Sequence, residues 1–242
     1  MKLIRPDWLA PAQIKAFTTT RQGGCSKGVY AGLNLGDHVA DDPLDVVENR
    51  RLLAAENGWQ DVQWLQQVHS TIAVEASGNG DVPQADACWT DKPGQVCVVM
   101  TADCLPVFIS NADGTRVAVA HAGWRGLVDG VVENTLQVFD QREDLHVWLG
   151  PAIGPDAFEV GEEVRQQFCD ELASSDTAFK PSVTEGKWLA DIYQLARLRL
   201  QNIGIEQVSG GDQCTFSQAD DFYSYRRDGV TGRMASVIWI DS

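Results

Sequence analysis

Short apolar segments bounded by turn residues alternate along the chain with amphipathic segments of helical period, and this alternation restricts the fold to a layered mixture of strands and helices. The apolar and β-branched segments predict strands over residues 15–20, 63–68, 71–75, 96–100, 116–120, 145–149, 205–208, 222–225 and 234–240. The periodic segments predict helices over residues 127–139, 160–172 and 190–203, and from Asp42 to Gly58. Because several strand pairs are close enough to form hairpins, we expect an α+β fold rather than a doubly wound sheet.

The helix that begins at Asp42-Pro43 has well-defined signals at both ends. Asp is a favourable N-cap residue and Pro suits the first helical position, whereas Gly58 can end the helix. One face of this helix is predicted to be apolar and to consist of Val46, Val47, Leu53 and Ala54.

Net charge limits the possible partners. The 242 residues include 19 Lys and Arg against 34 Asp and Glu, which gives a formal charge of −15. Nucleic acids and anionic membranes are bound largely through cationic side chains, so we expect neither as a partner. A small anion could still bind where a few Arg gather. The sequence does not indicate an oligomeric state.

We expect neither a targeting segment nor a membrane-spanning segment. Pro6 and Asp7 interrupt the N-terminal segment before an apolar signal-peptide core, and the longest strictly apolar run, Val96–Met100, is far shorter than the ~20 residues that span a bilayer. The six Cys form no C-x-x-C pair, which is typical of a reducing compartment. We therefore expect a cytoplasmic protein.

Three residues with suitable metal-binding atoms follow predicted strands. His69 follows W-L-Q-Q-V, His121 follows V-A-V-A, and Cys104 comes four residues after V-C-V-V-M. Two His and one Cys suit Zn²⁺ with a fourth position open. Each alone is also compatible with an ordinary polar loop residue, which is how we interpret His38 and His146.

Arg residues in glycine-containing segments are candidates for binding an anion. H-A-G-W-R-G places Arg125 and Gly126 at a predicted helix start, where backbone N–H groups favour phosphate, although a simple tight turn has the same pattern. Asp228-Gly229 predicts a hairpin turn close to further Arg residues. The complete set of substrate- or phosphate-binding candidates is Arg21, Arg125, Gly126, Arg226, Arg227 and Arg233.

These motifs together resemble the YfiH family. They occur in the family's order and cover nearly the whole chain: T-R-Q-G-G-C-S, N-L-G, E-N-R, Q-Q-V-H, T-A-D-C-L-P, H-A-G-W-R-G, G-P-A-I-G-P, F-E-V, G-G-D-Q-C-T and Y-S-Y-R-R-D-G-V-T-G-R-M-A-S. The resemblance implies one catalytic domain over residues 1–242, with an α/β/β/α sandwich related to the catalytic domain of cytotoxic necrotizing factor, a Cys-His deamidase toxin. It also implies that His69, Cys104 and His121 are metal ligands.

The activity implied by the resemblance is that of a zinc-dependent purine nucleoside phosphorylase. Such an enzyme would cleave adenosine, inosine, guanosine and methylthioadenosine with phosphate and would also deaminate adenosine. Zinc would activate water for deamination, and Cys104, His121, His69 and Asp103 are the candidate catalytic residues. Asp103 or Asp212 could protonate the leaving base.

Other functions fit parts of the pattern. An older family label is polyphenol oxidase, or laccase, and a His₂Cys set can also hold copper, although four His are too few for a multicopper laccase. Cys104 with His121 could instead form a metal-free hydrolase, with Asp103 or a polar loop residue orienting the His. A structural zinc site in a binding protein would need a fourth ligand, which the sequence does not offer.

Overall fold

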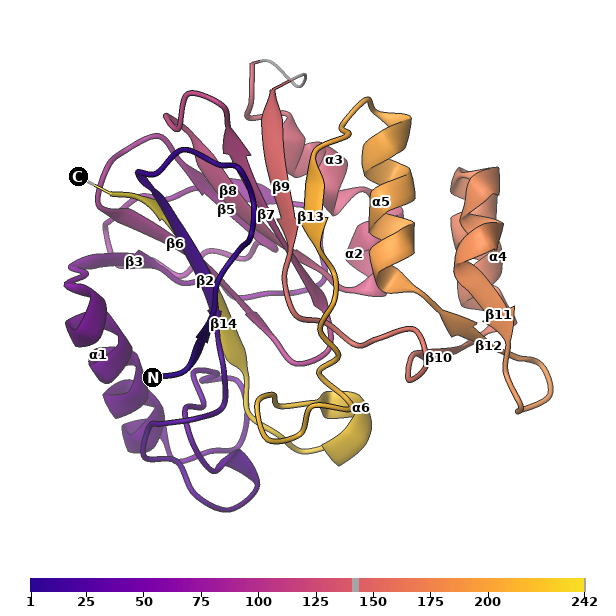
Figure 1. Cartoon of the computed structure of the whole chain (residues 1–242). Helices are drawn as coiled ribbons and strands as arrows, with labels where there is room; N and C mark the ends of the chain where they lie inside the picture. Colours follow the sequence, from indigo (N-terminus) through magenta and orange to yellow (C-terminus); the bar gives the residue numbers. More distant parts are fainter. Residues whose placement is uncertain (141–143, 242) are drawn as a thin grey trace.

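Two β-sheets packed face to face form the centre of the molecule (Figure 1). They are described by a computed structural model that covers residues 1–140 and 144–241. The first sheet contains, in spatial order, β1 (Leu3–Ile4), β2 (Ile14–Thr19), β14 (Met234–Ile240), β6 (Gln95–Thr101) and β3 (Asp61–Gln63). The second contains β13 (Val208–Gly210), β9 (Leu145–Leu149), β7 (Leu105–Asn111), β8 (Val117–Ala122), β5 (Ala87–Thr90) and β4 (Ala73–Glu75).

Successive side chains of β6 pack into two different apolar layers, one on each face of the first sheet. Val96 and Val98 pack with Leu53 of the helix outside the first sheet, whereas Cys97 and Val99 pack with side chains of the second sheet. Successive strand residues point to opposite faces, so a strand between two apolar layers must be apolar throughout. All seven residues of β6 are buried accordingly.

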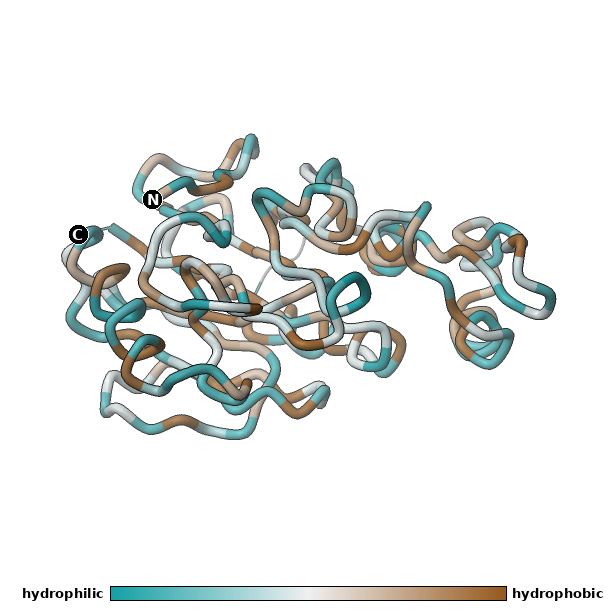
Figure 2. Tube along the Cα trace, turned by 90° about the horizontal axis from the view of Figure 1, so that it is seen from below, coloured by the Kyte–Doolittle hydropathy of each residue, from teal (hydrophilic) through white to brown (hydrophobic). Residues whose placement is uncertain are grey.

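Helices cover the outer faces of both sheets, which gives the order helix, sheet, sheet, helix. Helix α1 (Pro43–Asn57) lies outside the first sheet, where Leu53 contacts the core. Outside the second sheet lie α2 (Trp124–Asp129), α3 (Val131–Leu136) and α5 (Ile192–Asn202), whose apolar side chains share one core with β7, β8 and β9. Figure 2 shows the molecule from below, with hydrophobic and hydrophilic segments alternating along the chain.

A smaller unit lies beyond α5 at one end of the molecule (Figures 1 and 2). It comprises a three-stranded sheet and α4 (Glu162–Glu171), followed by the 3₁₀ helix η2 (Ala173–Ala178). The sheet contains β10 (Glu159–Gly161), β12 (Lys187–Ala190) and β11 (Phe179–Pro181). Val160, Phe168 and Phe179 join the core under α5, so the unit is continuous with the rest of the molecule. The remaining short helices are η1 (Gly28–Tyr30) and α6 (Tyr225–Asp228).

Most predicted elements are confirmed, and the ends of α1 match their sequence signals. The Asp42 side chain accepts a hydrogen bond from Leu44 N, Pro43 is the first helical residue, and Gly58 adopts φ of 70°. The predicted apolar face is only partly right. Val47 is 64% exposed, while the side chain of Asn49 is buried and hydrogen-bonds Ser26 Oγ and Asn34 O.

Four predicted elements differ from the structure. The helix expected over 127–139 is divided because Gly130 adopts φ of 97°, a left-handed conformation that ends α2 and precedes α3. The strand over 63–68 is mostly a loop with one isolated bridge at Gln66. The strand over 205–208 is shifted to 208–210. The strand over 222–225 and the hairpin at Asp228-Gly229 are wrong, because Ser224 caps the short helix α6.

Six strands of the structure were not predicted: β1, β5, β7, β10, β11 and β12. Pro106 lies within β7, and proline argues against a strand because it has no backbone N–H to donate. Its carbonyl nevertheless accepts a hydrogen bond from Gly150 N. Among the described residues, no helix is both long enough and apolar enough to cross a membrane.

Candidate metal centre

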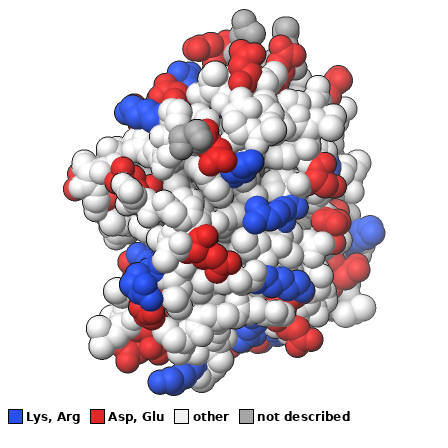
Figure 3. All heavy atoms as spheres, turned by 60° about the vertical axis from the view of Figure 1, so that its left-hand side comes forward, with Lys and Arg blue, Asp and Glu red and all other residues white. Residues whose placement is uncertain are grey.

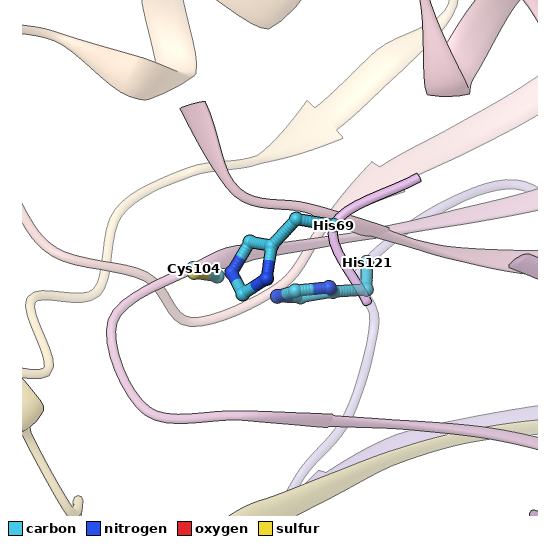
Figure 4. A group of neighbouring side chains, drawn as sticks. All are labelled: His69, Cys104 and His121. Carbon is cyan, nitrogen blue, oxygen red and sulfur yellow. The ribbon is translucent and has the colours of Figure 1, made fainter. Parts of the chain in front are cut away.

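The three predicted ligands converge from different parts of the chain (Figure 4). One donor atom from each of His69, Cys104 and His121 lies within 4.8 Å of the donor atoms of the other two. His121 is buried, Cys104 is partly exposed and His69 is exposed, so the group opens to solvent on the His69 side. The sequence prediction of a shared site is therefore consistent with the geometry.

The register between β7 and β8 brings Cys104 to His121. Cys104 lies in the turn that joins β6 of the first sheet to β7 of the second, and Pro106 of β7 pairs with His121 of β8. The sequence placed His121 beyond the end of a strand, whereas the structure places it within β8. The first sheet's strand β6 ends three residues before Cys104, and the second sheet's strand β7 begins one residue after it.

His69 is held by a loop with a constrained backbone. The residue adopts φ of 60°, which is uncommon outside glycine. The preceding Gln67 side chain hydrogen-bonds both the N–H and the carbonyl of Met100 at the end of β6. These side-chain bonds replace the strand pairing that the segment was expected to make, and they fix the loop next to the β6–β7 turn.

Asp86 connects the two histidines and is the functional residue that sequence reasoning missed. Its buried carboxylate accepts hydrogen bonds from the backbone N–H groups of Val68, His69 and Ser70, at 3.2, 3.1 and 2.6 Å. It also lies 2.8 Å from Nδ1 of His121. The sequence signal for Asp86 was an acidic residue within the apolar stretch A-D-A-C-W. A buried carboxylate is unfavourable unless its charge is paired and hydrogen-bonded.

The carboxylate of Asp86 keeps His121 oriented toward the cluster. Because an ionised carboxylate can only accept, Nδ1 of His121 must donate, and this leaves Nε2 as the ligand atom. Burial alone would raise the pKa of Asp86, but the hydrogen bond and charge of His121 and the bonds from Ser70 outweigh it and lower the pKa to about 2.

Without a metal, Cys104 and His121 act on each other as an ion pair. Burial would raise the pKa of the Cys104 thiol, yet the charge and hydrogen bonds of His121 and His69 lower it to about 6. Burial would lower the pKa of His121, yet the Cys104 thiolate and Asp86 raise it to about 9. The site therefore favours a thiolate at neutral pH, which is the form that binds metals.

Gly123 leaves space beside the ligands. A Cβ atom at this position would lie 3.1 Å from Cys104 Sγ and 3.1 Å from His69 Cδ2. The glycine in H-A-G-W is thus needed for room rather than for a turn, because its φ of −62° is available to any residue. The donor types, the orienting carboxylate and this space together fit a borderline-soft ion with three protein ligands.

The predicted acids lie in different surroundings. The Asp103 carboxylate accepts hydrogen bonds from Thr215 Oγ1 at 2.6 Å, Ser224 Oγ at 3.0 Å and Arg226 N at 2.6 Å. With these bonds it fastens the segment around α6, a role that the sequence did not indicate. Asp212 is exposed and does not line the cavity described below.

The candidate phosphate-binding residues separate into two groups. Arg227 uses all five of its side-chain N–H groups on three backbone carbonyls and Asp228, so no donor is left for phosphate. Arg21 donates to Ala219 O and lies over the Tyr223 ring. Arg227 therefore supports the fold around α6, which corrects its prediction as a phosphate ligand. Arg21 uses only one terminal nitrogen on the backbone and stays a candidate.

Three other Arg residues keep free donors near the site. Arg125 is exposed and stacks on Trp124, with the guanidinium carbon 4.4 Å from the ring centroid. Arg226 uses one terminal nitrogen on Glu159 O, and Arg233 uses one on Thr231 O and Gly232 O. Gly126 is buried within α2.

A cavity of about 160 Å³ adjoins Cys104. Its walls come from segments far apart in the sequence: Ala102, Asp103, Cys104, Trp124, Ile153, Phe158, Ile192, Tyr225 and Arg226. A larger, polar hollow around Asp91, Arg116 and Asp140 shares no residue with the ligand cluster. Because it lies next to the ligands, the smaller cavity is the candidate substrate site.

Comparison with known proteins agrees with this geometry. A family profile described as "Multi-copper polyphenol oxidoreductase laccase" matches residues 15–241. The purine nucleoside phosphorylase YfiH of Escherichia coli is 52% identical over 99% of both chains, and a purine nucleoside phosphorylase of Haemophilus influenzae is 50% identical over the full length of both. The chain belongs to the YfiH family.

Solved structures of the YfiH family confirm the fold. A Neisseria meningitidis protein is 48% identical and superposes with a TM-score of 0.96, covering all of both chains. YlmD of Geobacillus stearothermophilus is 30% identical with a TM-score of 0.94, covering all of this chain and 97% of that one. The predicted mixture of strands and helices in the arrangement of this family is therefore confirmed.

Proposed function

We propose that this chain is a zinc-dependent purine nucleoside phosphorylase that also deaminates adenosine. The observation that carries the proposal is the convergence of His69, Cys104 and His121 beside an apolar cavity, in a chain half identical to proteins named purine nucleoside phosphorylases. The substrates would be adenosine, inosine, guanosine and methylthioadenosine, each with phosphate. We take residues 1–242 as one catalytic domain, because the cavity walls extend from Ala102 to Arg226.

Zinc would be held by Nε2 of His121, Sγ of Cys104 and a ring nitrogen of His69. When bound, a three-ligand zinc supplies a Lewis acid that lowers the pKa of water. The protein itself orients His121 through Asp86, holds His69 in its loop and keeps the Cys104 thiol deprotonated. These contributions are independent of the identity of the metal.

Phosphate would bind at the rim of the cavity through Arg226 and Arg125. Arg226 lines the cavity, and Arg125 follows Trp124, which lines it from α2. First-turn N–H groups of a helix have no partner within the helix, so those of α2, including Gly126, add to the attraction for an anion. Arg233 is a third candidate.

The decisive experiment incubates the purified protein with adenosine, with and without phosphate, and identifies the products. Phosphate-dependent formation of adenine and ribose 1-phosphate supports phosphorolysis, and formation of inosine supports deamination. Arg226→Ala should reduce adenine formation roughly 10- to 100-fold, which corresponds to one lost charge-assisted hydrogen bond, while inosine formation suffers less. Adenine and inosine falling together would contradict a phosphate role for Arg226.

Copper-dependent polyphenol oxidation is a second candidate, favoured by the description of the family profile and by the His₂Cys donor set. Metal analysis of protein purified without added copper separates it from the first proposal. Zinc at about one ion per chain, with no oxidation of a phenolic substrate, would reject the oxidoreductase.

A metal-free Cys-His hydrolase is a third candidate, favoured by the low pKa of the Cys104 thiol next to His121. It also agrees with the implied relation to the cytotoxic necrotizing factor domain. Nucleoside cleavage that persists in protein stripped of metal, and that stops on alkylation of Cys104, would favour this candidate over zinc.

A further inference from the structure

We propose that the cavity beside Cys104 is the nucleobase subsite and that Tyr225, Trp124 and Phe158 form its aromatic walls. The proposal deepens the proposed function and rests on it for the identity of the substrate. It assigns to the cavity the purine ring rather than the ribose or the phosphate.

The chemistry of the walls matches a flat aromatic ring. Apart from Asp103, Cys104 and Arg226, the lining consists of apolar or aromatic side chains, contributed by α2, α5, α6 and the segment around Phe158. Aromatic side chains bind bases by stacking, which tolerates different purines because each has a π-face. Ribose hydroxyls and phosphate oxygens need hydrogen-bond donors, and these walls offer few of them.

Among the lining residues, Tyr225 supports the assignment of a nucleobase subsite most directly. It is 61% exposed, so its ring stabilises the core little, yet it borders a cavity next to a metal-binding cluster. The helix that carries it has only four residues. Because the ring borders the cavity and is not covered by the core, its face is available for a flat ligand to stack on.

Hydrogen bonds to Asp103 hold Tyr225 in place. Ser224 and Arg226, the residues on either side, both donate to the Asp103 carboxylate. Since Asp103 directly precedes Cys104, one turn positions both the metal-binding thiol and the outer wall of the cavity. A base in the cavity would therefore present one edge to the metal position.

The position of Arg226 limits how far a bound phosphate can enter the cavity. Its guanidinium carbon lies 5.5 Å from the centroid of the Phe158 ring, and one terminal nitrogen donates to Glu159 O. This cation is held at the wall, so a phosphate bound to it lies at the rim. The ribose, which joins base to phosphate during phosphorolysis, would then span the mouth of the cavity.

The test measures binding of free adenine by equilibrium dialysis, together with the KM for adenosine in the phosphorolysis assay. Tyr225→Ala should weaken adenine binding roughly 10-fold, the scale of one lost base–aromatic stack. Tyr225→Phe keeps the ring and should bind as the wild type does. Val230→Ala removes an exposed apolar side chain nearby and is the matched control.

Ribose 1-phosphate, dialysed in parallel, tests the alternative occupant. If Tyr225→Ala loses ribose 1-phosphate affinity but keeps adenine affinity, the cavity binds the sugar and the proposal is overturned. The proposal is also overturned if two proteins, the single variant Tyr225→Ala and the double variant Trp124→Phe with Phe158→Leu, both bind adenine as tightly as the wild type. If the wild type forms no adenine from adenosine but Tyr225→Ala still loses adenine affinity, the proposed function fails while the base subsite stands.

Discussion

At the scale of single residues, Asp86 determines how the site is organised. One buried carboxylate orients His121 and also binds three consecutive backbone N–H groups of the loop that carries His69. Mutation of a group that hydrogen-bonds a metal-binding His typically lowers metal affinity roughly 10- to 100-fold. The two histidines are thus preorganised by one residue that is not among the three candidate ligands.

Asp86→Asn should therefore lower zinc affinity about 10- to 100-fold, because an amide orients His121 less well and cannot accept from all the same donors. Affinity can be measured by competition with a chromophoric chelator. Asp113→Asn changes an exposed Asp on another loop and should bind zinc as the wild type does. Equal affinities for Asp86→Asn and the wild type would show that the carboxylate does not support the ligands.

The pKa of Cys104 predicts a selective thiol reaction in metal-free protein. Thiolate is the reactive form, so alkylation of Cys104 should accelerate as pH rises through about 6. Burial would raise the pKa of Cys214, but hydrogen bonds from Ser217 and Gly154 outweigh it and lower this pKa as well, so the Cys214 peptide is followed separately. Cys25, Cys97 and Cys169, whose pKa values burial raises, should react only at higher pH. Peptide mapping after brief iodoacetamide treatment at each pH gives the profile. His121→Ala should move the midpoint upward; an unmoved midpoint would mean that His121 does not stabilise the thiolate.

At the scale of secondary-structure elements, α6 depends on a residue from a distant turn. Asp103, with φ of 89°, accepts hydrogen bonds from Thr215, Ser224 and Arg226, which lie more than 100 residues later in the chain. Four helical residues cannot be stable alone, because helix nucleation is unfavourable. The position of α6 over the cavity is therefore a tertiary effect.

Asp103→Ala should loosen the segment from residue 213 to 229, since it leaves several donors without their acceptor, at about 1–3 kcal/mol for each buried one. Hydrogen exchange followed by mass spectrometry should show faster exchange in that segment and little change in β2 or β9. Asp103→Asn keeps one acceptor and tolerates a left-handed backbone, so its effect should be smaller. Unchanged exchange in Asp103→Ala would refute the fastening role.

At the scale of the whole molecule, a metal would link the two sheets. His121 belongs to the second sheet, Cys104 to the turn between the sheets, and His69 to the loop after β3 of the first sheet. A ligand that binds only the folded state stabilises it by mass action, by about 2.7 kcal/mol at 100 times its Kd. Metal removal should therefore affect the stability of the entire fold.

For a chain of this size, that stabilisation corresponds to a rise in Tm of roughly 5–10 °C. Differential scanning calorimetry of metal-free protein, with and without added zinc, measures it. Cys104→Ala should remain folded but show no zinc-dependent rise, while Cys169→Ala, which changes a partly exposed thiol elsewhere, should respond as the wild type does. Equal zinc responses in both variants would contradict ligation by Cys104.

The arrangement of charges also belongs to this scale. Figure 3 shows Lys and Arg interspersed with Asp and Glu over one face rather than gathered into a single basic surface. The net charge of −15 is thus carried, on this face, by a surface of mixed sign.

The amino-acid sequence by itself determined what depends on local chemistry. Strand β9 and helix α1 follow from alternation, capping and a terminal glycine, which act between residues close in the chain. The types of the three ligands were also evident, because few residues bind zinc and only four His are present. The motifs along nearly the whole chain, taken together, led to the correct family.

Only the tertiary structure decided which polar residues serve the site and which serve the fold. Asp103, a candidate general acid, accepts three hydrogen bonds that fasten the segment around α6, and Arg227, a candidate phosphate ligand, has no free donor. Asp86 was overlooked because its partner His121 lies 35 residues away. Hydrogen bonds between distant segments depend on sheet register and on the path of loops, and neither is encoded in the local pattern of residues.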